Sequence, residues 1–466
     1  MPDEYELIII GSGAAGTAAA TTAVHYGASR IAIVERGPLW GTCIRTGCIP
    51  SKFLLTLAGE AYYRGHSHPG ILGESQLDVK KVIAEKTALQ EKLLEKKHDH
   101  IFTRLGVEVI EGEGKFLSSS ALQVGRRKLS AKKFIIATGS SPVVPPFAGI
   151  STVPVMTIAE ALSPQRVPAS LIIIGGRALG LEFAQLYAHL GTQVTVLQRS
   201  PRILPDDDPE IADLMAGYLA KEGIAIHTGT EIHRVEQSGE SVTVIAQTGG
   251  KQEAITAERL LLATGRSPNT QELSCSAAGV DTRKDGSVIV DTTLRTTAPN
   301  IWAAGDAVGE PMLETAAKYG GEIAAINALS ELKRSFNRAF LPHGVFTTPQ
   351  VASVGMTEER AGIAGLQPVS HSISTGSMAK FSIDGDTRGL VKIVAEKTTR
   401  RILGIHICAP IATEMIQEGV IAMMWHLTTD DLAEIPHVFP TATEALAVCA
   451  RGFSKKAPGQ AMKNSP

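Results

Sequence analysis

One pattern occurs twice in this sequence, and it constrains the fold more than any other feature. An apolar run enters a glycine-rich turn, a helix-forming segment follows, and a second apolar run closes the pattern. The first copy covers residues 5–35 and the second covers residues 171–197. A strand that passes through a tight turn into a helix and then into a parallel strand is the βαβ unit of dinucleotide-binding sheets. We therefore expect two Rossmann-like units in an α/β protein.

The first copy contains the full set of residues that such a turn requires. Gly11 permits the tight turn, Gly13 lets the backbone approach a pyrophosphate, and Gly16 lets helix and strand pack closely. The helix N-terminus then receives the phosphate charge. Glu35 ends the second strand and would accept hydrogen bonds from an adenosine ribose. A plain tight turn is the alternative, but strand, helix and acid in register favour a dinucleotide site.

The second copy departs from this pattern at two places. Gly175 and Gly180 are kept, but Arg177 occupies the middle position of the turn. At the end of the second strand, Gln198 stands where a ribose-binding acid is expected, and Arg199 follows it. A carboxylate would repel a 2′-phosphate, whereas a guanidinium can pair with one. We expect NADPH to be preferred, with NADH as a possible substrate; the alternative for Arg199 is a solvated loop residue.

The composition narrows the classes of protein to consider. Lys and Arg number 45 against 47 Asp and Glu, so the formal net charge is −2 and no broad positive field would attract nucleic acid or anionic lipid. The apolar runs are far shorter than the roughly 20 residues that span a bilayer. Residues 1–6 lack the basic start of a secretory signal. We therefore expect a cytoplasmic protein that binds neither nucleic acid nor a membrane.

Two of the five cysteines lie close together in the sequence. Cys43 and Cys48 are separated by four residues, whereas the other three are dispersed, which does not fit a disulfide-stapled secreted fold. The pair can close a disulfide, and a neighbouring helix N-terminus would lower the pKa of a thiol. No second Cys/His pair has metal-ligand spacing, so we expect a redox couple and no metal site.

The stretch 41–52, Gly-Thr-Cys-Ile-Arg-Thr-Gly-Cys-Ile-Pro-Ser-Lys, resembles the redox-active disulfide motif of class I pyridine nucleotide-disulfide oxidoreductases. That family includes lipoamide dehydrogenase, glutathione reductase and mercuric reductase. The resemblance covers nearly the whole chain: both glycine turns, two Ala-Thr-Gly segments at 137–139 and 263–265, Gly305-Asp306, and residues 348–358. It implies a flavoprotein oxidoreductase in which electrons pass from NADPH through FAD and a Cys43–Cys48 disulfide to an acceptor.

The resemblance also implies roles for individual residues. Cys48 would be the thiolate that faces the flavin, and Cys43 the thiol that exchanges with substrate. Lys52 would approach the flavin N5 atom, Glu182 would pair with this lysine, and Asp306 would bind the ribitol hydroxyls of FAD. For each of these charges the alternative is a solvated, capping or turn residue. The remaining residues expected to bind FAD or the nicotinamide cofactor are Gly41, Thr42, Thr138, Gly139, Gly265 and Gly305.

The length of 466 residues predicts about three domains, which the resemblance divides into segments. We expect two Rossmann-like domains, for FAD and NAD(P), plus a C-terminal α+β dimerisation domain. The expected segments are an FAD-binding domain at 1–149 and 269–340, an NAD(P)-binding domain at 150–268, a dimerisation domain at 341–453 and a flexible tail at 454–466.

One C-terminal position breaks the family pattern. Disulfide-reducing members carry a His-Pro pair that supplies an acid/base to the partner subunit, with a glutamate five positions later. Here Phe439 stands in place of the histidine, while Pro440 and Glu444 match. A phenyl ring cannot carry a proton, so general acid/base catalysis would lack its usual agent. His437 would lie on the same face of an extended segment and could substitute; the alternative is a structural histidine.

Three enzymatic hypotheses remain open. The main one is a disulfide oxidoreductase of dihydrolipoamide dehydrogenase type, acting on a lipoyl or other small thiol/disulfide partner. The alternative is a mercuric-reductase-like enzyme that takes a metal ion, although Cys449 stands alone near the C-terminus. A third is a ketopropyl-coenzyme M carboxylase-like enzyme, against which Glu444 argues. A non-catalytic flavoprotein scaffold is the fourth possibility. All the enzymatic hypotheses imply a homodimer in which His437 and Glu444 complete the partner's site.

Overall fold

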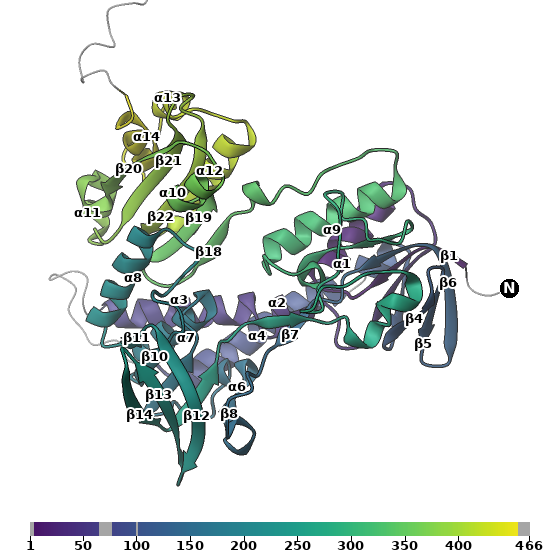
Figure 1. Cartoon of the computed structure of the whole chain (residues 1–466), viewed down its shortest axis with the longest axis horizontal. Coiled ribbons are helices and arrows are strands. Elements are labelled where there is room, and N and C mark those ends of the chain that lie inside the picture. The colour runs from purple at the N-terminus through teal and green to yellow at the C-terminus, as the bar shows by residue number, and fades with distance from the viewer. Residues whose placement is uncertain (1–3, 65–76, 99–100, 455–466) are drawn as a thin grey trace, which may run out of the picture. The chain divides into compact units, whose positions relative to one another are not determined.

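The computed structural model describes residues 4–64, 77–98 and 101–454 (Figure 1). Except for Ser454, the tail expected over 454–466 lies outside these residues. The chain forms two compact units, the first made of Met1–Leu54, Val79–Pro145 and Thr264–Arg338 and the second of the remaining residues. The domain boundaries expected at 149, 268 and 340 stay a prediction. None of the helices in the described part combines the length and apolarity of a membrane span.

The first unit contains a seven-stranded sheet with helices packed against it and a separate two-stranded sheet. Its strands are β1 (Glu4–Ile10), β2 (Ile31–Glu35), β3 (Val107–Glu111), β4 (Gly114–Ser118), β5 (Ala121–Val124), β6 (Arg127–Ile136), β7 (Ser140–Pro142), β16 (Arg266–Pro268) and β17 (Ile301–Ala303). Its helices are α1 (Ala14–His25), α2 (Gly41–Arg45), α4 (Val79–His98), α5 (Ile101–Arg104) and α9 (Glu314–Leu329), with short 3₁₀ turns η2 (Gln271–Leu273), η3 (Cys275–Ala278) and η4 (Gly305–Val308). The helix α3 (Cys48–Arg64) begins in this unit, and its residues from Leu55 belong to the second.

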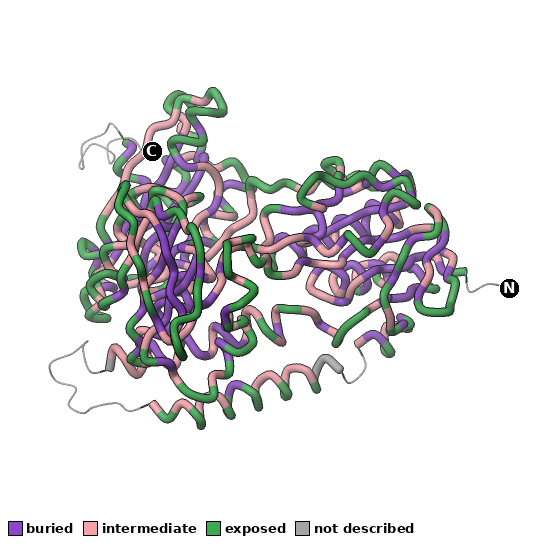
Figure 2. Tube along the Cα trace, turned by 60° about the horizontal axis from the view of Figure 1, so that its bottom comes forward, coloured by how far each residue is buried: buried purple, intermediate pink, exposed green. Residues whose placement is uncertain are grey.

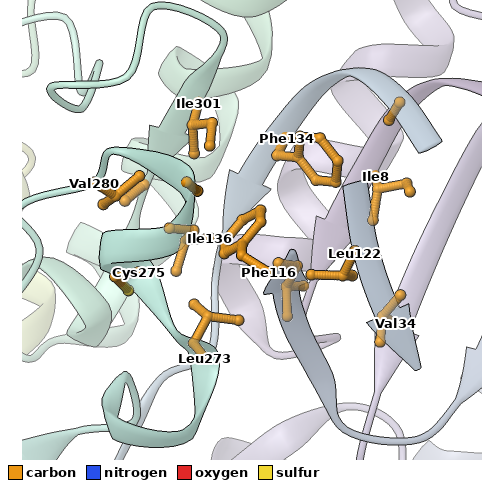
Figure 3. Close-up of a cluster of buried hydrophobic side chains, with 14 of the residues drawn as sticks. Ile8, Val34, Phe116, Leu122, Phe134, Ile136, Leu273, Cys275, Val280 and Ile301 are labelled. Atoms are coloured by element: carbon orange, nitrogen blue, oxygen red, sulfur yellow. The ribbon is translucent and has the colours of Figure 1, made fainter. Parts of the chain in front are cut away.

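Strand β1 is apolar at successive positions because both of its faces are buried in the unit. Strands β3, β2, β1, β6 and β17 are parallel, and β5 and β4 continue from β6 in antiparallel order. Leu7 and Ile9 point into the core under α1 and α9, which lie side by side (Figure 1). Ile8 points to the opposite face, where Phe116 and Phe134 pack (Figure 3). A strand buried on both faces reads as a continuous apolar run rather than an alternating one.

The second unit contains three sheets. Its strands are β8 (Val155–Met156), β9 (Ser170–Ile174), β10 (Gln193–Leu197), β11 (Ala225–His227), β12 (Thr230–Ser238), β13 (Ser241–Thr248), β14 (Lys251–Ala257), β15 (Arg259–Leu262), β18 (His343–Val345), β19 (Gln350–Gly355), β20 (Pro368–Ser374), β21 (Leu390–Glu396) and β22 (Ile402–Ala409). Its helices are α6 (Ile158–Ala161), α7 (Ala178–His189), α8 (Pro209–Lys221), α10 (Glu358–Ile363), α11 (Ala379–Asp384), α12 (Ala412–Met424), α13 (Thr429–Glu434) and α14 (Glu444–Arg451), with 3₁₀ turns η1 (Ile150–Thr152) and η6 (Thr375–Ser377). The turn η5 (Arg338–Phe340) joins the two units.

The order of strands confirms the expected fold class. The parallel sheet β11-β10-β9-β15-β8 is the second Rossmann-like sheet, and β12-β13-β14 is an antiparallel addition to it. The C-terminal part forms the antiparallel sheet β18-β19-β22-β21-β20, whose apolar face packs under α12 and α14. Figure 2 shows the buried stretches in the interior of each unit. The protein is thus α/β with a C-terminal α+β part.

Candidate active site

The cysteine pair lies where two helices meet. Cys43 is in the short helix α2, and Cys48 is the first residue of α3. Gly47 makes this approach possible, because a Cβ atom at that position would stand 2.9 Å from the Thr42 carbonyl oxygen and 3.1 Å from the Cys43 Cα atom. Both cysteines carry free thiols. The structure therefore brings the two predicted redox sulfurs together at a helix N-terminus.

The pKa of Cys48 is lowered from its ordinary value to about 7. The main cause is a hydrogen bond from the Cys43 thiol, and the charge of Lys52 adds to it, while burial and Glu314 act in the opposite direction. Near neutral pH, a large share of Cys48 is therefore thiolate, which is the nucleophilic and metal-binding form of cysteine. The charge of Lys52 thus acts on the thiol, and its expected approach to the flavin N5 atom stays a prediction.

A residue that the sequence did not point to holds the end of α2. Gln90, on α4, donates hydrogen bonds of 2.8 Å to the carbonyl oxygens of both Ile44 and Arg45. These carbonyls end the helix that carries Cys43, and carbonyls at a helix end lack intrahelical partners. No local signal identifies Gln90, because it lies within a Lys/Glu-rich helix more than forty residues away in sequence.

The first glycine turn has the geometry that the motif requires. Gly11 has φ +108°, and a Cβ atom there would stand 2.2 Å from the Ala137 carbonyl oxygen. A Cβ atom at Gly16 would stand 1.9 Å from the Gly11 carbonyl oxygen, which explains the close packing of helix and strand. At Gly13, by contrast, nothing lies within 4 Å of that position. The turn thus leaves open space at the one glycine that should face a pyrophosphate.

Glu35 is connected to this turn through a residue that sequence reasoning did not select. Ser12 is fully buried, and its backbone N–H and hydroxyl both donate to Glu35 Oε2 at 2.8 Å. The Ser12 hydroxyl also accepts from the Trp40 N–H at 3.1 Å. A Cβ atom at Gly41 would stand 3.0 Å from the Gly13 Cα atom, so these two predicted cofactor residues are adjacent. Ser12 therefore links the acid, the turn and the start of the cysteine segment.

Asp306 is held by two partners in the same unit. The Ser140 hydroxyl donates to Asp306 Oδ2 at 2.5 Å, and Arg266 lies 3.9 Å from the same oxygen. Arg266 also donates to the Ser140 hydroxyl and carbonyl at 2.6 Å. Gly305 has φ +71°, and a Cβ atom there would stand 3.1 Å from the Cβ atom of Ala15 in α1. The predicted ribitol ligand is therefore fixed close to the first glycine turn.

The two Ala-Thr-Gly segments meet through their continuations. Strand β7, which follows Gly139, pairs with β16, which follows Gly265. Both glycines have positive φ, +68° and +108°. The buried Thr138 Oγ1 atom has no hydrogen-bond partner in the described part of the chain. A Cβ atom at Gly11 would stand 3.3 Å from the Thr138 Cα atom, so this buried hydroxyl without a partner belongs to the residues around the first glycine turn and fits a bound polar cofactor. The residues of this unit therefore fit FAD.

The second glycine turn lies in the second unit. Gly175 has φ +117°, and a Cβ atom at Gly180 would stand 1.9 Å from the Gly175 carbonyl oxygen, as in the first turn. Gln198 is buried, and its Oε1 atom accepts from the Gly176 N–H at 2.9 Å. Arg199 is exposed beside it. This side chain is therefore available to a ligand, as the NADPH prediction requires.

Glu182 is buried in α7 and oriented by the chain that precedes β19. Its Oε1 atom accepts from the Phe346 N–H at 2.9 Å. One turn further along α7, Gln185 accepts from the Thr348 N–H at 2.7 Å and donates to the Thr348 carbonyl at 2.8 Å. Lys52 belongs to the first unit and Glu182 to the second, and their pairing stays a prediction.

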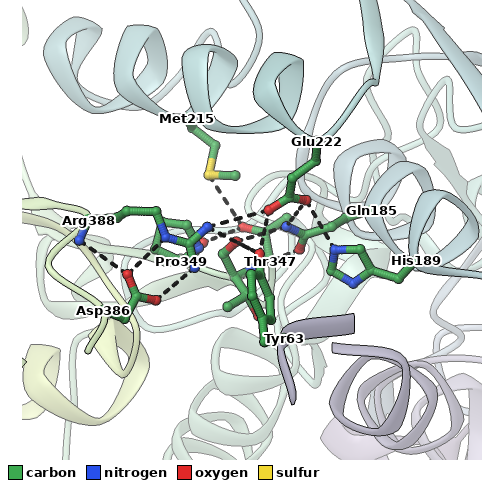
Figure 4. Close-up of polar contacts among 10 residues, drawn as sticks. Tyr63, Gln185, His189, Met215, Glu222, Thr347, Pro349, Asp386 and Arg388 are labelled. Carbon is green, nitrogen blue, oxygen red and sulfur yellow. Dashed lines mark hydrogen bonds and ion pairs between the residues drawn. The ribbon is translucent and has the colours of Figure 1, made fainter. Parts of the chain in front are cut away.

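A polar network anchors the far end of the helix that begins at Cys48 (Figure 4). Glu222 accepts hydrogen bonds from Tyr63, Gln185 and Arg388, and its Oε2 atom lies 3.1 Å from His189 Nε2. Burial opposes ionisation of Glu222, but these hydrogen bonds hold its pKa below the ordinary value. Arg388 is in turn bound by both oxygens of Asp386, at 2.8 and 2.7 Å. The network thus joins α3, α7, α8 and the C-terminal part through one carboxylate.

The C-terminal candidate residues differ from one another in exposure. Phe439 is 71% exposed, whereas the His437 side chain is 7% exposed. His437 Nε2 lies 3.1 Å from Glu418 Oε2, and its Nδ1 lies 2.9 Å from the Ile435 carbonyl oxygen. Both ring nitrogens are therefore engaged within the same chain, which favours the structural interpretation of His437. Glu444 is the first residue of α14. Its catalytic role stays a prediction.

Comparison with known proteins gives consistent matches over the whole length. Residues 5–321 match the family model "Pyridine nucleotide-disulphide oxidoreductase", and residues 341–449 match its dimerisation domain. The mercuric reductase of Lysinibacillus sphaericus is 36% identical, covering 97% of this chain and 83% of that protein. The mercuric reductase of Streptomyces lividans is 37% identical, covering 97% and 96%.

Solved structures agree with these matches. The Cu(II) complex of the HOCl-induced flavoprotein disulfide reductase RclA from Escherichia coli superimposes with a TM-score of 0.86 at 30% identity, covering 97% of this chain and all of that one. The family uses FAD and NAD(P)H, which agrees with the glycine turns and the open space at Gly13. The chain therefore belongs to the class I pyridine nucleotide-disulfide oxidoreductases, as an enzyme that carries their dimerisation domain.

Proposed function

We propose that this enzyme uses NAD(P)H to reduce a soft metal ion held by the Cys43 and Cys48 thiolates, with Hg²⁺ as its first substrate. The proposal rests on one observation. The pKa of Cys48 in the thiol pair is about 7, and Phe439 stands in place of the acid/base histidine. The mercuric reductases among its relatives support it. We therefore prefer the mercuric-reductase-like hypothesis to the dihydrolipoamide dehydrogenase type.

The thiol pair suits a metal substrate. Soft ions prefer thiolate ligands over oxygen and nitrogen. Because the pKa of Cys48 is about 7, one sulfur is available as thiolate near neutral pH, and the hydrogen bond from Cys43 keeps the second sulfur close to it. Binding an ion between the two would release the Cys43 proton, since a metal displaces protons from its ligands. The site would then hold the ion with two charged sulfurs.

The proposed reaction is Hg²⁺ + NAD(P)H → Hg⁰ + NAD(P)⁺ + H⁺. Bound FAD would supply the passage of two electrons from the nicotinamide to the thiol side. The chain's own residues would hold the cofactor: Gly13 leaves open space where its pyrophosphate would lie, Glu35 would accept from its ribose, and Asp306 would accept from its ribitol. Thr138 Oγ1 offers a further buried polar contact.

Reduction of a disulfide substrate would benefit from a proton donor that this chain lacks at position 439. Each disulfide that is cleaved expels a thiolate, and a positioned acid that protonates it accelerates such a step by roughly 10²- to 10⁴-fold. Phe439 cannot donate a proton, and both nitrogens of His437 have partners in their own chain. Reduction of a metal ion needs no proton at that point, so a phenylalanine does not slow it.

The test compares acceptors in the holoenzyme. NADPH oxidation is followed with Hg²⁺ in excess small thiol, and with lipoamide or glutathione disulfide. We expect fast turnover with Hg²⁺ and slow turnover with both disulfides. Phe439→His should raise disulfide turnover, by up to about 10²-fold, because it restores an acid. Ile363→His, at another exposed apolar position, is the matched control and should not. Faster turnover of either disulfide than of Hg²⁺ in the unmodified enzyme would refute the proposal.

Cu²⁺ is a second candidate substrate. The observation that favours it is the solved Cu(II) complex of the related RclA protein. Two Cu²⁺ ions would take the two electrons of one NAD(P)H and leave as Cu⁺. A parallel assay with Cu²⁺ decides between the two ions: a kcat/KM above that of Hg²⁺ would make copper the principal substrate.

We further propose a homodimer in which the C-terminal residues of one subunit complete the site of the other. Large exposed apolar side chains lie on α12, next to its two ends and between α13 and α14, within the segment that matches the dimerisation domain. We call this set the α12 apolar surface: Ile411, Ile421, Met424, Trp425, Ile435, Val438 and Phe439. Exposed apolar groups of this size mark protein–protein contacts. We also propose a cytosolic location, because the five cysteines are too few and too dispersed for a disulfide-stapled secreted fold.

A further inference from the structure

The second glycine turn carries a charge where the motif normally has none. Arg177 is the N-cap residue of α7, with extended backbone at φ −90° and ψ −177°. It occupies the position of Gly13 in the first turn, where nothing lies within 4 Å of the space that a side chain would fill. A side chain at this point starts where the pyrophosphate of a dinucleotide approaches the turn. Arg177 must therefore either obstruct the nicotinamide cofactor or bind it.

The guanidinium of Arg177 already has an acidic partner. Asp206 Oδ2 pairs with Arg177, and Asp206 Oδ1 lies 3.2 Å from Arg360 on α10. All three side chains are about half exposed. One carboxylate is thus shared by two guanidinium groups beside the start of α7. If Arg177 leaves, Asp206 keeps Arg360 as a counter-ion.

The loop that carries Asp206 is fixed to the glycine turn. The Leu204 N–H donates to the Gly176 carbonyl at 2.9 Å, and the Gly176 N–H donates to Gln198 at 2.9 Å. Asp207 is engaged elsewhere, with His343 at 2.9 Å. These backbone hydrogen bonds therefore keep the loop that carries Asp206 next to Arg177.

We propose that Arg177 binds the pyrophosphate of NAD(P)H and that Asp206 competes with the cofactor for it. In the free enzyme Arg177 pairs with Asp206, and on binding it turns to the pyrophosphate while Asp206 stays with Arg360. A guanidinium binds a phosphate through paired, charge-assisted hydrogen bonds, which replaces the close backbone approach that a glycine would permit. The cofactor thus has to displace an internal anion, which lowers its affinity.

This role differs from that of the arginines after β10. Arg199 and Arg202 are exposed and make no ion pair within the described part of the chain. They follow the strand whose end approaches the adenosine ribose, so they suit a 2′-phosphate, which only NADPH carries. Arg177 stands at the pyrophosphate, which NADPH and NADH share. Arg177 should therefore set affinity for both cofactors, and Arg199 the preference between them.

Binding of NADP⁺ and NAD⁺ to the oxidised holoenzyme, measured by calorimetry, tests the proposal. Arg177→Gln should weaken both cofactors by about tenfold, since a charge-assisted hydrogen bond is worth roughly 1.5 kcal/mol or more. Asp206→Asn should tighten both severalfold, because it removes the competitor. Arg199→Gln should weaken NADP⁺ alone. Arg166→Gln, another exposed arginine paired with a glutamate, Glu258, is the matched control and should change neither.

The opposite signs separate this role from a structural one. If the ion pair only stabilised the loop, Asp206→Asn would weaken binding as Arg177→Gln does. An unchanged dissociation constant in Arg177→Gln, or an unchanged or larger one in Asp206→Asn, would overturn the proposal. The measurement involves no electron acceptor, so its result is independent of whether the enzyme reduces a metal ion or a disulfide.

Discussion

At the scale of single residues, the candidate site depends on how Cys48 is surrounded. Its position at the start of α3, the hydrogen bond from Cys43 and the charge of Lys52 together stabilise a thiolate. The three buried cysteines are different, because burial raises the pKa of Cys275 and raises those of Cys408 and Cys449 to about 12. The reactivity of Cys48 compared with these three buried thiols therefore follows from local geometry.

This difference predicts the pH dependence of alkylation in the reduced enzyme. Labelling of Cys48 by iodoacetamide should rise with pH through a midpoint near 7, because only the thiolate reacts and it forms as pH passes the pKa. Cys43→Ala removes the hydrogen bond and should move the midpoint upward, toward the ordinary value. Mass spectrometry of the Cys48 peptide measures this, with the Cys449 peptide as an internal control. A midpoint that stays near 7 in Cys43→Ala would show that Cys43 is not its main cause.

The sequence predicted those site residues whose role is fixed by short-range spacing. Gly11, Gly13, Gly16 and Glu35 follow one strand-turn-helix unit, so their places could be derived in advance. Ser12 could not, because the hydrogen bond from its hydroxyl to Glu35 requires the side chain to turn inward, and serine in a turn usually faces solvent. Gln90 could not either, since its partners on α2 are distant in sequence.

At the scale of elements, one network determines how α3 and α7 are held at their distal ends. Both helices carry proposed catalytic residues near their starts, Cys48 and Glu182. Toward their other ends, Tyr63 and His189 both contact Glu222. Burial is the main cause that raises the pKa of Tyr63, so its hydroxyl stays protonated and donates at any ordinary pH. No sequence motif revealed this network, because Tyr63, Glu222 and Arg388 are far apart in sequence.

Tyr63→Phe tests how much this network contributes to the stability of the fold. Removing one hydroxyl leaves Glu222 with fewer donors, so the free energy of unfolding should fall by about 1–2 kcal/mol. Chemical denaturation of the holoenzyme measures it. Tyr26→Phe is the control, because Tyr26 lies in the first unit outside the network. A loss no greater than that of the control would mean that Glu222 is satisfied without Tyr63.

At the scale of the whole molecule, the C-terminal part carries several large apolar side chains that are exposed among the described residues. Trp425 is 76% exposed and Val438 80%, in a protein whose other large apolar side chains mostly lie in defined cores. The match to the family's dimerisation domain covers these residues. The fold class could be predicted from two glycine turns, but the residues of this surface could not, because exposure depends on how α12 packs on its sheet.

Trp425→Glu should dissociate the proposed homodimer. A charge in the centre of an apolar interface loses its hydration without gaining a partner. Sedimentation velocity should then show a monomer, and metal turnover should fall with it, because each site would lack the partner's C-terminal segment. Ile363→Glu places the same charge at a position that is 81% exposed outside the α12 apolar surface, and should stay dimeric. A monomeric Trp425→Glu protein with full turnover would contradict a shared site.

The central claim is that electrons from NADPH leave this enzyme on a metal ion. The most direct measurement collects elemental mercury from the headspace of a sealed, anaerobic reaction of holoenzyme, NADPH and Hg²⁺ in excess small thiol. We expect one mercury atom to be released for each NADPH oxidised, and almost none from a Cys43→Ala/Cys48→Ala variant. NADPH oxidation without release of elemental mercury, or equal release from the double variant, would contradict it.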